Sequence, residues 1–148
     1  MRFRLPLTAV GAVLFMTGVV FLSIGCEHDI PAGPAQVQPV QPLLSDIQAK
    51  IFTLKCVNAG CHPGGGAPMS LATGTSYTTL VGPGGTGVVS SGYAPRLRVS
   101  PGNANNSVLY LKIAGTTLGS RMPLNQQPLS AAEISAIQTW INNGAQNN

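Results

Sequence analysis

Charge is the scarcest property of this sequence. Only 8% of its 148 residues are charged, and the formal net charge is +4 at pH 7. The cations beyond position 26 are dispersed along the chain: Lys50, Lys55, Arg96, Arg98, Lys112 and Arg121. Because nucleic-acid-binding surfaces cluster their Lys and Arg residues, this pattern argues against that class despite a sequence pI of about 9.3. The short length also excludes an enzyme of two large lobes.

The residue sets of several common sites are missing as well. The glycine-rich stretches 64–66 and 82–85 neither follow a strand pattern nor precede a Lys-Ser or Lys-Thr pair, so they predict loops rather than a phosphate-binding turn. Besides the Cys and His residues of positions 56–62, a four-ligand zinc site would have only His28, in a proline-rich spacer. No motif supplies the orienting Asn or Asp that a catalytic Cys-His pair needs.

Residues 1–25 have the layout of an export signal. Two arginines precede an uncharged apolar stretch, which ends in small residues before Cys26. Positions 22–26, Leu-Ser-Ile-Gly-Cys, resemble the bacterial lipobox, although its leucine stands one place early. This resemblance implies cleavage before Cys26 and lipid on its sulfur, and Glu27 favours the outer membrane. The alternative is an uncleaved helix, since about 20 residues suffice to cross a bilayer; either way the remaining chain lies outside the cytoplasm, in the cell envelope.

The segment after Cys26 predicts a spacer followed by one small domain. Residues 26–42 contain four prolines, three glutamines and no apolar periodicity, which favours an extended linker. We expect the folded domain to cover residues 43–146. A domain of this size has a small core that a covalent or cofactor link would stabilise.

The domain predicts helices rather than strands. Ser45 can cap a first helix that runs to Cys56, with Ile47, Ile51 and Leu54 on one face. A short turn is expected over 77–81, and a second helix over 108–113, ended by Gly115. The clearest helix starts with a capping box over 130–133, has a face of three isoleucines beside Trp140, and stops at Gly144.

Positions 56–62, Cys-Val-Asn-Ala-Gly-Cys-His, contain the residues that carry chemistry. In the usual haem c attachment signal two cysteines are separated by two residues and followed by histidine, whereas here four residues separate Cys56 from Cys61. Two thiols add to the vinyl groups of haem, and His62 would then lie beneath the iron. Asn58 and Gly60 can adopt the left-handed conformations that a longer loop requires. A local disulfide between the two cysteines is the alternative in an oxidising compartment.

A haem iron held by histidine commonly takes methionine as its second axial ligand. Met122 precedes Pro123 in a loop, and the proline favours an extended backbone that would present the thioether to a buried metal. Met69 follows His62 by only seven residues and is expected to stay on the histidine side. We therefore favour Met122, with Met69 left open. Arg121, or alternatively Arg96 or Arg98, could pair with a haem propionate.

Taken in order, these motifs resemble class I cytochrome c domains, in particular small c-type domains of planctomycetes and delta-proteobacteria. The resemblance covers residues 43–146 and departs from the family in the four-residue gap. It implies an all-α fold of three to four helices around one haem, with long glycine-rich loops and with the first and last helices crossing beside the haem. It also implies covalent attachment at Cys56 and Cys61, with His62 and Met122 on the iron.

The sequence thus predicts a lipid-anchored, exported electron carrier that exchanges single electrons with redox proteins and has no small-molecule substrate. It is not expected to be an enzyme. Two alternatives remain open: a haem-free lipoprotein whose disulfide loop displays a binding surface, and a haem enzyme of peroxidase type whose distal position opens to substrate.

Overall fold

The computed structural model describes residues 38–57, 61–63 and 68–148, which belong to one compact unit, Val37–Asn148. In this part of the chain every named element is a helix, and β structure is limited to two isolated bridges. The elements are α1 (Leu44–Ile47), η1 (Gln48–Cys56), α2 (Ser76–Leu80), η2 (Ala104–Asn106), α3 (Val108–Ala114) and α4 (Ala131–Asn142). The prediction of an all-α domain is confirmed. The predicted export segment, Cys26 and most of the linker lie outside the described residues.

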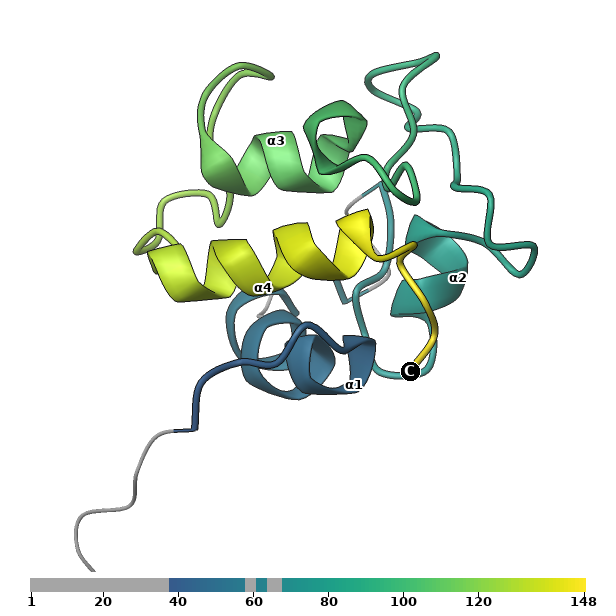
Figure 1. Cartoon of the computed structure of the whole chain (residues 1–148). Helices are drawn as coiled ribbons and strands as arrows, with labels where there is room; N and C mark the ends of the chain where they lie inside the picture. The colour runs from purple at the N-terminus through teal and green to yellow at the C-terminus, as the bar shows by residue number, and fades with distance from the viewer. Residues whose placement is uncertain (1–37, 58–60, 64–67) are drawn as a thin grey trace, which may run out of the picture. The chain divides into compact units, whose positions relative to one another are not determined.

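Helix α4 lies between α3 and the helix formed by α1 and η1 (Figure 1). Its inward face buries Ile137, Trp140 and Ile141 almost completely. The indole nitrogen of Trp140 donates to the carbonyl of Gln146 at 2.8 Å, so the buried ring keeps its hydrogen bond. At the first turn the predicted capping box between Ser130 and Glu133 is present. The local signals of this helix were therefore sufficient to predict it.

The first helix differs from its prediction in register. α1 continues directly into η1, which is π-helical, so that backbone bonds join residues five apart instead of four. The wider turn brings Phe52 to the core, where only 1% of it is exposed, while Leu54 is 62% exposed. The predicted face of Ile47, Ile51 and Leu54 is therefore wrong at its last position, because it assumed the 3.6-residue period of an α-helix.

The start of this helix also differs. Leu43 is the N-cap, and Ser45 lies in the first turn without capping it. The free amides are instead satisfied by Asn148, whose side-chain oxygen accepts from Leu44 N at 2.9 Å and whose backbone carbonyl accepts from Ser45 N at 2.8 Å. Because this cap comes from the far end of the chain, no local pattern could predict it.

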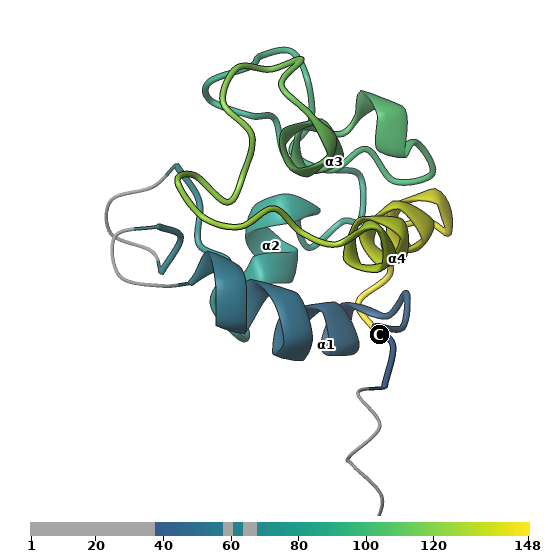
Figure 2. The ribbon, with the colours of Figure 1, turned by 90° about the vertical axis from the view of Figure 1, so that its left-hand side faces the viewer.

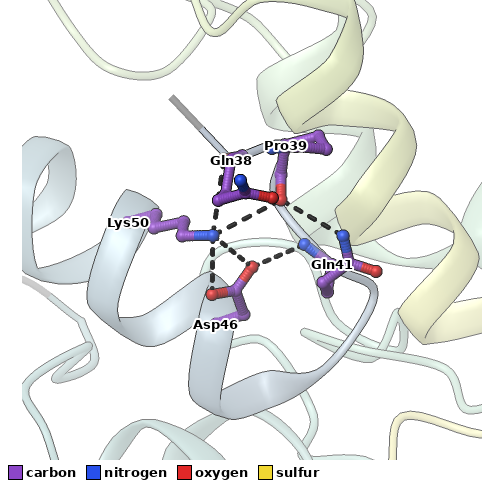
Figure 3. Close-up of polar contacts among 5 residues, drawn as sticks. All are labelled: Gln38, Pro39, Gln41, Asp46 and Lys50. Carbon is purple, nitrogen blue, oxygen red and sulfur yellow. Dashed lines mark hydrogen bonds and ion pairs between the residues drawn. The ribbon is translucent and has the colours of Figure 1, made fainter. Parts of the chain in front are cut away.

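The last linker residues contact the domain (Figure 3). Lys50 lies at the centre of these contacts: its ammonium group donates to the carbonyl of Pro39 at 3.3 Å and pairs with Asp46 at 2.9 Å. The amide of Gln41 donates to the same carboxylate at 2.5 Å. Val40 packs against the core. Residues 38–42 are thus held against the first helix. Separately, no helix within the described ranges is long and apolar enough to cross a membrane.

Candidate functional site

The four residues predicted to bind haem line one pocket. Its volume is about 400 Å³, and Cys56, Cys61, His62 and Met122 all form part of its wall. Most of the remaining wall is apolar, and it comes from the end of η1, the segments after it, helix α3 and the loop between α3 and α4. Figure 2 shows these loop segments on the same side of the unit. Cofactor and ligand pockets typically have volumes of roughly 300–1,000 Å³, so the size is suitable for such a molecule.

The imidazole of His62 has a fixed orientation. Its Nδ1 lies 3.3 Å from the carbonyl oxygen of Met69. Because a carbonyl can only accept, this contact is a hydrogen bond when Nδ1 carries the ring proton, and in that tautomer the Nε2 lone pair is available to a metal. Histidine ligands of metals are usually held by such a bond from the other ring nitrogen.

The backbone around His62 is held at both ends. His62 N donates to the Cys56 carbonyl at 3.0 Å, and the amide of Leu71 donates to the His62 carbonyl at 2.8 Å. The first bond closes the loop between Cys56 and His62, so that the longer spacing still brings thiol and imidazole to one pocket. Asn58 and Gly60, which were expected to form the bulge, lie outside the described residues.

Both cysteines are half-buried free thiols. Burial, followed by the nearby Cys61, raises the pKa of Cys56 to about 11. A thiol with such a pKa remains protonated at neutral pH and is a poor nucleophile. Cys56 is therefore not the activated thiolate that catalysis by a Cys-His pair requires.

The two methionines of the pocket come from different segments of the chain. Met122 lies in the loop between α3 and α4, and its amide donates to the carbonyl of Lys112 in α3 at 2.7 Å. Met69 also lines the pocket, but its backbone carbonyl is the partner of the His62 ring. Both methionines are half-buried against the core. The backbone of Met69 thus lies next to the His62 ring, and Met122 comes to the same pocket from a separate segment.

The arginine at the pocket is Arg98. Its guanidinium donates to the carbonyls of Thr79 and Pro68 at 2.8 and 2.9 Å, and it forms part of the pocket wall. Arg121, the preferred propionate partner from sequence, is exposed and does not line the pocket. A pairing of Arg121 with a haem propionate stays a prediction from its position next to Met122 in the chain.

Two further wall residues had no sequence signal. Tyr93 and Lys112 contact each other across the pocket wall, with the Lys112 ammonium 5.8 Å from the centre of the Tyr93 ring. Neither belongs to a motif, and they are 19 positions apart in the chain. Only the fold brings them together.

The chain matches no family model, no curated protein and no solved structure. Among residues 38–57, 61–63 and 68–148, no group of three or more His, Cys, Asp or Glu side chains is placed to hold a metal ion.

Proposed function

We propose that this protein is an exported, membrane-anchored electron carrier with one covalently bound haem c. Cys56 and Cys61 form the thioether bonds, and His62 and Met122 are the axial ligands of the iron. The observation that carries the proposal is the His62 ring, which has its free nitrogen available in an apolar pocket that both thiols and Met122 line. In this proposal the domain has a cytochrome c-like fold.

The residues of the pocket fit this group. A porphyrin provides four nitrogen ligands itself, so the protein needs to supply only one imidazole and one thioether. The apolar wall suits the macrocycle, and Arg98 supplies a cation for its carboxylates. The two thiols line the same pocket as the imidazole, as attachment at two vinyl groups requires.

Each residue then has a defined task in electron transfer. Haem, when bound, supplies an iron that gains and loses one electron. The thioether of Met122 is a soft ligand that favours the reduced metal, and the apolar wall excludes water; both raise the reduction potential. Leu124 belongs to the wall and is 47% exposed, so the pocket reaches the surface there. Redox proteins would exchange electrons there in short encounters, while lipid on Cys26 holds the carrier at the membrane.

The first test is covalent haem attachment. The full chain is produced in a host that attaches haem c, and the denatured protein is stained for haem and weighed by mass spectrometry. We expect one haem per chain, and loss of the stain in Cys56→Ala, Cys61→Ala. A double variant that still stains contradicts the proposal. A colourless wild-type protein that lacks one hydrogen from each of two thiols would instead support the disulfide-bonded binding module.

The second test separates the two methionines. The oxidised Met122→Ala protein should lose the sulfur-to-iron charge-transfer absorption and bind external ligands, whereas the control Met69→Leu should keep that absorption. The opposite result would assign the distal position to Met69. Unchanged spectra in both variants would mean that a residue other than methionine is the ligand.

A further inference from the structure

The loop that carries Met122 is held by few apolar contacts. Between α3 and Met122, residues 116, 117 and 119–121 are exposed, and only Gly115 and Leu118 are partly buried. Polar bonds must therefore fix the position of this segment. Such bonds come from two residues outside it, Tyr93 and Lys112.

Lys112 holds the loop with both its backbone and its side chain. Its carbonyl accepts the Met122 amide at 2.7 Å. Its ammonium group donates to the carbonyls of Ser120 at 2.6 Å and Leu118 at 3.2 Å, two and four residues before Met122. The register of α3 thereby determines where the loop returns to the pocket.

Tyr93 holds the same loop from another segment. Its hydroxyl donates to the Leu118 carbonyl at 2.8 Å, and it lies 3.5 Å from the ammonium group of Lys112. Both side chains line the pocket, so these bonds form at the wall beside Met122. Tyr93 and Lys112 both donate to the carbonyl of Leu118, so the hydrogen bond from each residue helps to hold the acceptor of the other.

We propose that Tyr93 and Lys112 are positioning residues that hold the Met122 thioether at the pocket and so resist its displacement by other ligands. This inference depends on the proposed function for its ligand chemistry, but not for the loop geometry. Opening the loop requires these bonds to break. Weakening them should therefore favour any external ligand that competes with Met122.

The experiment measures imidazole binding to the oxidised full-length haem protein. Binding is detected as the loss of the sulfur-to-iron charge-transfer absorption. Tyr93→Phe removes one hydroxyl and should tighten the apparent imidazole affinity about fivefold, the effect of one net hydrogen bond. Lys112→Met should tighten it more than about tenfold, because two bonds from a charged donor are lost. Lys112→Arg, which can still donate to two carbonyls, should restore an affinity near that of the wild type.

Two control variants match these changes away from the loop. Tyr110→Phe removes a hydroxyl that makes no hydrogen bond to another described residue, and Lys50→Met removes an ammonium group paired with Asp46. Both should bind imidazole as the wild type does. Wild-type affinity in Tyr93→Phe and Lys112→Met would overturn the inference while leaving haem attachment intact.

A second measurement keeps the two proposals distinguishable. If the wild-type protein carries no haem, the proposed function fails, and amide hydrogen exchange at Gly119 and Met122 still tests the loop. Faster exchange at these amides in Tyr93→Phe than in Tyr110→Phe supports the positioning role. Equal exchange in the two variants overturns it.

Discussion

Glu133 connects the start of α4 to the end of the helix that carries Cys56. One carboxylate oxygen pairs with Lys55 at 2.6 Å, and the other accepts from the backbone amide of Ser130 at 2.8 Å. Glu133→Gln is an informative change because glutamine also serves in a capping box, so that mainly the charge is removed. The variant thus tests the negative charge of Glu133 and leaves its role in the capping box in place.

The expected cost follows from two contributions. The Lys55 side chain is 38% exposed, so solvent screening limits the ion pair to about 0.5–1 kcal/mol. A negative charge in the first turn of a helix contributes about 0.3–1 kcal/mol more. Glu133→Gln should therefore lower the free energy of unfolding by about 1.5 kcal/mol at pH 7.

The pH dependence provides the sharper test. Burial alone would raise the pKa of Glu133, but the hydrogen bonds from Lys55 and Ser130 outweigh burial and lower this pKa below its ordinary value. A lowered pKa contributes stability that is fully present above the unfolded-state pKa of about 4.3 and is lost as pH falls through the folded-state value. The difference between wild type and Glu133→Gln should stay constant from about pH 7 to 5 and shrink below about pH 4.

Urea unfolding followed by circular dichroism at several pH values measures this difference. In a Lys55→Met background, which removes the ion-pair partner, Glu133→Gln should cost less at pH 7, and the double-mutant cycle gives the coupling energy. An equal cost at pH 3 and pH 7 would refute the electrostatic reasoning. It would show that the amide disturbs the packing instead.

Two further changes test the fold and the pocket. Gly87→Ala should lower the free energy of unfolding by about 3 kcal/mol, measured by urea unfolding. The φ angle of Gly87 is +94°, and the added Cβ would clash with the Val99 carbonyl and lie 2.7 Å from Leu97 Cδ1. Gly92→Ala is the control, because nothing lies within 4 Å of its added Cβ. Arg98→Met should lower the reduction potential measured by redox titration, because loss of a pocket cation favours the more positive oxidised iron. The same change should lower the free energy of unfolding by about 1–2 kcal/mol. The exposed Arg121→Met should change neither, and an equal effect of both arginines would contradict the placement of Arg98 in the wall.

The sequence predicted those features whose cause is local. The capping box of α4, its buried face and its end at Gly144, where φ is +97°, depend on residues a few positions apart. The motif of positions 56–62 likewise identified which thiols and which imidazole share a pocket. These predictions succeeded because the interactions involved lie within a turn or two of helix.

Features with distant causes could not be predicted in this way. The π-helical register places Phe52 in the core where an α-helix would have placed Leu54, and no local residue pattern marks this register. Arg98 is placed in the pocket by carbonyls 19 and 30 positions away. Arg121 had the more suggestive position in the sequence, next to Met122, but it is exposed and does not line the pocket. Sequence spacing therefore identified the proposed ligands, which share one pocket, but not the residues that support them.

The two sides of the proposed iron site are held by different kinds of contact. On the His62 side, three bonds involve the backbone within one short segment, including the bond that fixes the ring. On the Met122 side, the exposed loop depends on Tyr93 and Lys112. An external ligand should therefore displace Met122 and leave His62 in place. The strength of that loop attachment decides between an electron carrier, which keeps both ligands, and a peroxidase-like enzyme, which must open one position to substrate.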